Sequence, residues 1–327
     1  MRWLVTFLLL LMTSCVSEHP SAPSAGQAHR SAQKDFETDE SLRQQLQSAL
    51  QQKNPRYDGQ GRFHFQNGQL LAAYLQGSGV EDISPLSGYK LELLELVQTS
   101  VSDLSPLQGM ALEQLILSGT ALDDLQGLGG IPLKALDLMD TRVRNLGPLQ
   151  GMDLEILLLE GIPVTDVGPL QGMPLQKLWL NRTQVSNLQP LAGMPLRELN
   201  LLETSVEDLS PLQGMPLEML WLNDTPVTDI DALSGMPLLS LTLKGTAVTD
   251  LTVVRHLPRL ERLHAGETPV TDLTPLKDLH LTRLIFTPGR IKNGLEEIRQ
   301  METLREIGTT FENRMPAAKF WEKYGSK

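Results

Sequence analysis

Leucines recur along most of this chain at a fixed spacing. The unit is cleanest at 206–226, VEDLSPLQGMPLEMLWLNDTP; nine copies begin 21 residues apart from Val80 to Val248, and a tenth begins at Val270. The first eight units contain Leu-x-x-Leu-x-Leu, whose last two leucines are separated by one variable residue, and the pattern weakens in the last two units. Alternation with a period of two predicts a short strand with both leucines facing the interior. Repetition at this length predicts a solenoid, in which each unit packs on its neighbours.

The remainder of each unit predicts a tight turn. An aspartate or asparagine, such as Asp208, precedes Ser-Pro-Leu or a variant of it. These residue types favour helix N-caps, and proline suits the first turn of a helix, so we expect a single 3₁₀ turn in most units. A threonine such as Thr225 follows the last leucine by three residues. Its hydroxyl can bond backbone groups, and the threonine column could equally be a packing column.

Leucine spacing, aspartate and Ser-Pro-Leu together resemble the leucine-rich repeat, and the tail of the unit is most similar to the bacterial internalin type. The resemblance covers ten repeats at 80–290. It implies an α/β-type solenoid: a horseshoe with a parallel β-sheet on the concave face, short 3₁₀ turns on the convex side and a cap at each end. Two features depart from internalins. The period is one residue shorter than usual, and threonine replaces the asparagine of the usual hydrogen-bond ladder.

The segments that flank the repeats are predicted to cap them. At 36–79 we expect an N-terminal cap made of a helix at 36–53 and a hairpin around Asn67-Gly68, a strong turn signal. At 291–327 we expect a C-terminal cap with short helices and one further strand. Three aromatic residues are expected to cover the last repeat there: Phe320, Trp321 and Tyr324. Caps are required because a terminal repeat otherwise exposes its apolar face and strand edge.

The start of the chain predicts export. Residues 1–14 combine Arg2, an apolar run too short to span a bilayer, and small residues before Cys15. This resembles the bacterial lipobox, which implies cleavage before Cys15, lipidation of that residue and anchoring in a membrane. The alternative is an ordinary secretory signal with an incidental cysteine. Residues 15–35, rich in Ser, Ala and Pro, are expected to form a flexible tether after the lipidated cysteine.

The resemblance to a lipoprotein places the protein in a bacterial cell envelope, anchored by lipid. Val16 follows the cysteine where an inner-membrane retention signal of the enterobacterial type has aspartate. We therefore expect the outer membrane or the cell surface rather than the inner membrane.

The net charge and the absence of known motifs argue against several classes of function. The formal net charge is −11 and no basic cluster is present, so nucleic acid is not an expected partner. No nucleophile elbow, His-Glu-x-x-His motif, Walker loop or kinase signature occurs, and we expect no enzyme, cofactor or metal site. His256, His264 and His280 lack ligand spacing and are expected at ordinary surface positions. The Asp/Asn column is expected to cap turns rather than to bind calcium.

The residues that alternate with the inward leucines should face the concave side of the sheet. Two of them, Trp179 and Trp221, fall two strands apart, about 10 Å by strand spacing. The candidate binding residues on this face are Trp179, Trp221, Asn181, Asn200, Asn223, Leu158, Leu202, Met139 and Met219. Exposed aromatic and aliphatic residues with a polar rim are typical of a binding surface. A register error of one residue would invert this assignment.

Three functions remain open. The first is binding of a protein or peptide, from the apolar patch and the family resemblance. The second is binding of glycan or peptidoglycan, with the tryptophans stacking on sugars and the asparagines bonding hydroxyls. The third is a structural spacer of the envelope, in which case the aromatic and aliphatic residues merely suit strands.

Overall fold

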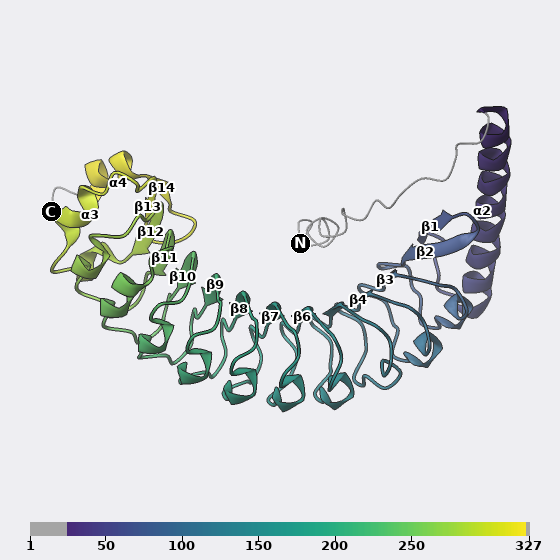
Figure 1. Cartoon of the computed structure of the whole chain (residues 1–327), viewed down its shortest axis with the longest axis horizontal. Helices are drawn as coiled ribbons and strands as arrows, with labels where there is room; N and C mark the ends of the chain where they lie inside the picture. The colour runs from purple at the N-terminus through teal and green to yellow at the C-terminus, as the bar shows by residue number, and fades with distance from the viewer. Residues whose placement is uncertain (1–24, 325–327) are drawn as a thin grey trace.

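One continuous sheet lines the inner side of an arc, and the turns that connect its strands lie on the outer side (Figure 1). The computed structural model describes residues 25–324. Strand order in the sheet follows chain order from β1 to β14, and every pair from β2–β3 to β12–β13 is parallel. The strands are β1 (Arg62–Gln66), β2 (Gln69–Tyr74), β3 (Leu93–Glu95), β4 (Gln114–Ile116), β5 (Ala135–Asp137), β6 (Ile156–Leu158), β7 (Lys177–Trp179), β8 (Glu198–Asn200), β9 (Met219–Trp221), β10 (Ser240–Thr242), β11 (Arg262–Ala265), β12 (Arg283–Phe286), β13 (Glu306–Gly308) and β14 (Met315–Pro316).

The outer side carries short 3₁₀ helices, as the Pro-containing turns predict. They are η2 (Ser84–Leu86), η3 (Ser105–Leu107), η4 (Gly147–Leu149), η5 (Gly168–Leu170), η6 (Gln189–Leu191), η7 (Ser210–Leu212), η8 (Asp231–Leu233), η9 (Thr252–His256), η10 (Thr274–Leu276) and η11 (Pro288–Arg290). The repeat before β5 has no such turn. Gly127 stands there in place of the proline of other repeats and takes a left-handed φ of +99°. A proline would fix φ near −65° for a 3₁₀ turn, and glycine gives up that preference.

The Asp and Asn residues that precede the turns lie one residue before the N-cap position and not at it. Asp208 lies before Leu209, the N-cap residue of η7, and its Oδ1 accepts the backbone N–H of Ser210 at 2.8 Å. This bond to the residue two positions on is an Asx turn. Ten repeats share it, from Asp82 to Asp272, with distances of 2.7–3.0 Å. The N-cap expectation was therefore right in residue type and wrong in position.

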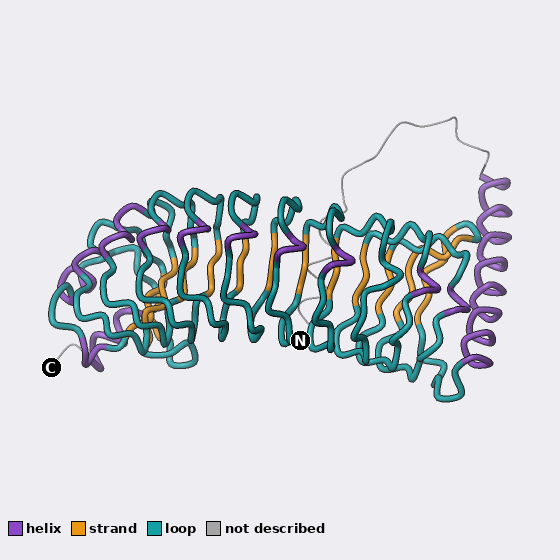
Figure 2. Tube along the Cα trace, turned by 90° about the horizontal axis from the view of Figure 1, so that it is seen from below, coloured by secondary structure: helices purple, strands orange, loops and turns teal. Residues whose placement is uncertain are grey.

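The threonine column makes local bonds and no ladder between repeats. Thr225 Oγ1 donates to the carbonyl of Leu222 in its own repeat at 2.7 Å, and the other threonines of the column repeat this contact. The strands themselves lie side by side (Figure 2). Backbone hydrogen bonds join each strand to the next. The interior between sheet and turns is filled by leucines that are entirely buried, such as Leu220 and Leu222.

The N-terminal end is closed by helix α2 (Ala25–Lys53) and the β1–β2 hairpin. Asn67 and Gly68 form the turn of the hairpin with positive φ, and Asp39 Oδ1 accepts the N–H of Gly68 at 2.7 Å. The expected tether therefore proves wrong over residues 25–35, which belong to α2. Alanine, glutamine, arginine and lysine favour helix there, and no proline lies between Pro23 and Pro55 to interrupt it.

The C-terminal end is closed by α3 (Leu295–Arg299), the β13–β14 pair and α4 (Ala317–Tyr324). Phe320 is fully buried and lies 5.8 Å, ring centre to ring centre, from Phe286 of β12. Trp321 and Tyr324 pack against Phe320. The aromatic cover predicted from the sequence thus sits on the last repeat.

Within residues 25–324, none of the helices is both long and apolar enough to cross a membrane. The expected signal peptide at 1–14, Cys15 and the first part of the tether lie outside the described residues.

Candidate binding surface on the concave face

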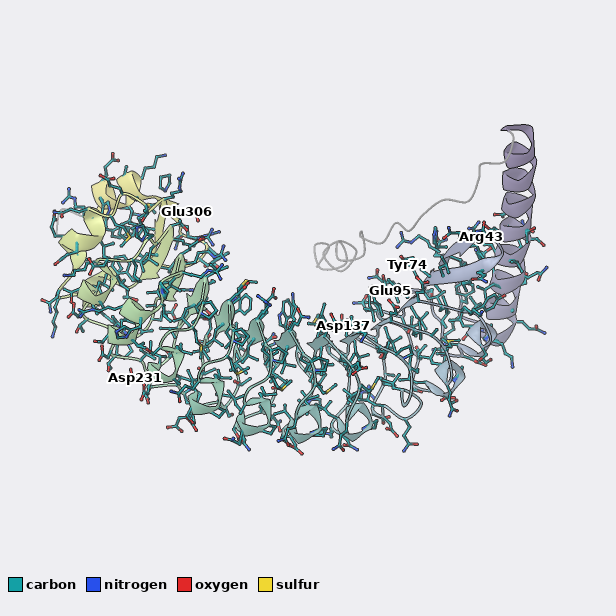
Figure 3. All side chains as sticks on the ribbon, in the orientation of Figure 1. Arg43, Tyr74, Glu95, Asp137, Asp231 and Glu306 are labelled. Carbon is teal, nitrogen blue, oxygen red and sulfur yellow. The ribbon has the colours of Figure 1, made fainter. Side chains whose placement is uncertain are left out.

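Three columns of side chains face the hollow of the arc, one from the start of each strand, one from two residues later and one from just after the strand. In the repeat of β9 they are Met219, Trp221 and Asn223, which alternate with buried Leu220 and Leu222. The predicted register is therefore the one in the structure. Figure 3 shows Tyr74, Glu95 and Asp137 on this concave side, whereas Asp231 lies on the outer side. We call the three columns together the concave face.

The two tryptophans lie on strands β7 and β9, with β8 between them. Trp179 pairs in register with Asn200, and Asn200 with Trp221. Both indoles are half-buried. The ammonium of Lys177 lies 4.9 Å from the centre of the Trp179 ring and 2.9 Å from Glu198 Oε2. One side of Trp179 is thus occupied by the protein's own cation, while Trp221 has no such neighbour within the described residues.

The nine candidate residues differ in how much surface they offer. Trp179, Asn200, Trp221 and most of the others are half-buried. Leu158, flanked in register by Asp137 and Trp179, is only 2% exposed, and Asn181 is only 5% exposed. A ligand on this face would therefore touch Leu158 and Asn181 little unless their side chains rotate.

Buried polar atoms without a partner gather on this face. Within the side chains that the structure describes, five such atoms are found: Gln114 Oε1, Trp179 Nε1, Asn181 Oδ1, Asn223 Oδ1 and Thr242 Oγ1. All five belong to the three concave columns. A buried polar group without a partner costs about 1–3 kcal/mol. Native structures contain few of them, and an ordered water, local strain or a ligand can account for each.

Two carboxyl groups of the concave face are buried or half-buried. Glu95 and Asp137 lie toward the N-terminal end, where burial raises the pKa of both carboxyl groups. Asp137 accepts hydrogen bonds from Ser118 Oγ at 2.6 Å and from the N–H of Met139 at 2.9 Å. No group of three or more His, Cys, Asp or Glu side chains suited to a metal ion occurs in the described part of the chain.

The C-terminal half contains a pocket of about 220 Å³ that sequence reasoning missed. Its lining is Met219, Trp221, Ser240, Leu241, Thr242, Arg262, Leu263, His264, Arg283, Ile285 and Phe311. The strand alternation could have identified Arg262 and Arg283, which hold the first concave column. Phe311 could not have been found this way, because it follows β13 in an irregular segment and reaches the pocket from outside the repeats.

His264 corrects one expectation. It is not at an ordinary surface position but on β11, facing the concave side between Thr242 and Ile285, and is 9% exposed. Burial lowers its pKa, and the nearby Lys244 ammonium lowers it further. The imidazole is therefore held in its neutral form, able both to donate and to accept one hydrogen bond. His256 and His280 are exposed, as expected.

Solved structures resemble this arrangement. An internalin of Listeria monocytogenes, InlF, superposes with a TM-score of 0.69 at 22% identity over 83% of this chain and 88% of that one. A leucine-rich-repeat protein of Leptospira interrogans gives 0.59 at 19%, over 78% of this chain and 71% of that one. The plant peptide hormone receptor RGFR1, in complex with RGF2, gives 0.54 at 15%, over 71% and 46%. No protein-family model and no curated protein matches the sequence. The fold is that of a leucine-rich-repeat protein, close in structure to the internalin.

Proposed function

We propose that this protein is an exported, lipid-anchored binding module of a bacterial cell envelope that holds a protein or peptide segment on its concave face. The observation that carries the proposal is the make-up of that face, on which half-buried aromatic and amide side chains stand in register, as Trp179, Asn200 and Trp221 do. Five buried polar atoms without a partner in residues 38–324 also lie on that face, and a bound chain would bring backbone donors and acceptors to them once their side chains rotate outward.

The position of the tryptophans supports the same proposal. Trp221 is half-buried and lines a pocket on this face, a setting in which aromatic anchors contribute strongly to binding. By analogy of fold alone, the plant receptor named above holds a peptide. The glycan alternative is weaker at Trp179, because the Lys177 ammonium already lies over that ring, which a sugar would need for stacking.

The proposal is tested with the double variant Trp179→Ala/Trp221→Ala. Envelope fractions are passed over the wild-type chain and the variant, and we expect a protein band retained by the wild type to be lost from the variant. The matched control is Gln171→Ala/Gln213→Ala, which alters exposed outer residues of the same two repeats. Loss of binding to purified cell wall instead of a protein would favour the glycan function. Unchanged retention of both would contradict the concave face as the binding site.

A photo-crosslinking amino acid sharpens the same test. Placed at Leu202, which is half-buried on the concave face, it should attach to the retained partner; placed at exposed Gln213 on the outer side, it should not.

Lipid anchoring is tested in a separate experiment. Cys15→Ser should abolish metabolic labelling of the chain with fatty acid and release it from membranes, and labelling that persists would refute lipidation at Cys15.

A further inference from the structure

The pocket in the C-terminal half of the concave face differs in charge from the rest of the molecule. The chain has a formal net charge of −11, yet the lining of this pocket contains two arginines and no carboxylate. Arg262 and Arg283 occupy adjacent strands in register, β11 and β12. Neighbouring strands lie about 4.8 Å apart, so two like charges stand side by side.

Only one of these arginines has a counter-ion among the residues that the structure describes. Arg283 Nε lies 2.6 Å from Glu306 Oε2, and Arg314 shares that carboxylate at 3.6 Å. Arg262 pairs in register with Ser240 on its other side, and its guanidinium forms no ion pair or hydrogen bond with any described residue. A half-buried guanidinium next to another one favours an anion, and its planar donors suit a carboxylate.

Apolar side chains form much of the rest of the lining, beside Ser240, Thr242 and His264. Trp221 and Met219 stand at one side and Ile285 on the other. Phe311 is 51% exposed, the one large apolar side chain described that is so open to water. Its ring is fixed in place by the Arg314 guanidinium, 3.8 Å from the ring centre, and by Arg283 at 5.8 Å. An exposed aromatic ring held over a pocket is a preformed contact for an apolar side chain.

We propose that this pocket selects an acidic peptide segment, whose carboxylate binds the Arg262 guanidinium while an adjacent apolar side chain enters between Trp221 and Phe311. This inference rests on the proposed function and names the ligand's chemistry. The pocket is smaller than the 300–1,000 Å³ typical of small-molecule sites, so it suits one side chain of a longer ligand. Thr242 Oγ1, buried without a partner on β10, lies between the arginine and the tryptophan strands and can bond the ligand backbone after rotation of its side chain.

A peptide library tests this directly. Random heptapeptides displayed on phage are selected against the full chain, and the selected sequences are synthesised for binding by fluorescence anisotropy. We expect an Asp or Glu next to Leu, Phe, Tyr or Trp. Replacing that acid by its amide should weaken binding at least tenfold, and Arg262→Gln should cause a similar loss and remove the difference between the two peptides. Comparing free and amidated peptide C-termini shows whether a side-chain or a terminal carboxylate is read.

Two controls keep the result interpretable. Arg255→Gln removes an exposed arginine on η9 of the outer side and should leave binding unchanged. Arg262→Gln should melt at the wild-type temperature, because the arginine has no partner to lose. Peptides that bind without an acidic residue, and whose binding is lost only in Trp179→Ala/Trp221→Ala, would overturn this inference and leave the proposed function intact. If no peptide binds the chain and an oligogalacturonate probe binds it in a manner that depends on Arg262, both this inference and the proposed function are overturned.

Discussion

At the residue scale, equivalent positions of different repeats show which side chains serve the fold and which do not. Asp137 and Asn200 hold the same place in the middle concave column, on β5 and β8. Each accepts the backbone N–H two residues on, from Met139 at 2.9 Å and from Leu202 at 3.1 Å. An uncharged amide oxygen therefore makes the same bond at this place as a carboxylate oxygen does.

This comparison predicts a pH-dependent effect of Asp137→Asn. Burial raises the pKa of Asp137 in the folded state, so its favourable contribution exists below the unfolded pKa and is lost as pH rises through the folded one. The variant should be more stable than the wild type at pH 7, by about 1 kcal/mol or less, and the difference should vanish near the pKa of a free aspartate, about pH 4. Urea unfolding at both pH values measures it.

Asp208→Asn is the matched control, with the opposite sign. Hydrogen bonds from the N–H and hydroxyl of Ser210 lower the pKa of Asp208, so its contribution is present at neutral pH and is lost as pH falls. This variant should be less stable than the wild type at pH 7 and should approach it in acid. Parallel pH profiles for the two variants would contradict the assignment of burial as the cause at Asp137.

At the element scale, one side chain joins the N-terminal helix to the first repeat. Asn54, 2% exposed, lies just after α2. Its Nδ2 donates to the carbonyls of Leu50 at 3.0 Å and Asp82 at 2.8 Å, and its Oδ1 accepts the N–H groups of Glu81 and Asp82 at 2.8 and 2.7 Å. The helix and the edge of the solenoid are thus connected by a fully satisfied amide.

We expect Asn54→Ala to lower the free energy of unfolding by about 2–4 kcal/mol, because it leaves several buried backbone groups without partners. Asn145→Ala is the control. It removes one exposed bond, to the N–H of Gly147 at 2.8 Å, and should cost about 1 kcal/mol. Hydrogen exchange should show the loss of protection in α2 and the hairpin for the first variant only. Equal losses in the two variants would show that Asn54 does not join the helix to the repeats.

The elements were largely predictable from the sequence, and the reasons differ by element. Strands and turns repeat, so every copy reinforces the same register, and Asn67-Gly68 specifies its hairpin locally. The start of α2 was not predictable, because the Ser-, Ala- and Pro-rich composition of residues 15–35 resembles a linker although its second half favours helix. The pocket was half predictable: Arg262 follows from alternation, whereas Phe311 reaches it through tertiary packing that no periodicity encodes.

At the scale of the whole molecule, a solenoid distributes stability along one dimension. Each strand contacts only its two neighbours in the sheet, so a defect at one end weakens the nearest repeats and leaves distant ones unchanged. The concave face spans most of this length, and the pocket lies toward its C-terminal end. Binding in the C-terminal pocket therefore depends on the C-terminal cap more than on α2.

Phe320→Ala tests this dependence. The side chain is fully buried against Phe286, and its loss should cost about 3–5 kcal/mol. Hydrogen exchange should rise in β12, β13 and α4, and little in β3–β6. Peptide binding at the pocket should fall with the local protection, because Phe311 and Arg283 lie within the loosened region. Phe311→Ala is the matched control, an exposed ring in the same cap whose removal should change stability by less than about 1 kcal/mol and still weaken peptide binding. A uniform rise of exchange along all strands in Phe320→Ala would show instead that the solenoid unfolds as one cooperative unit.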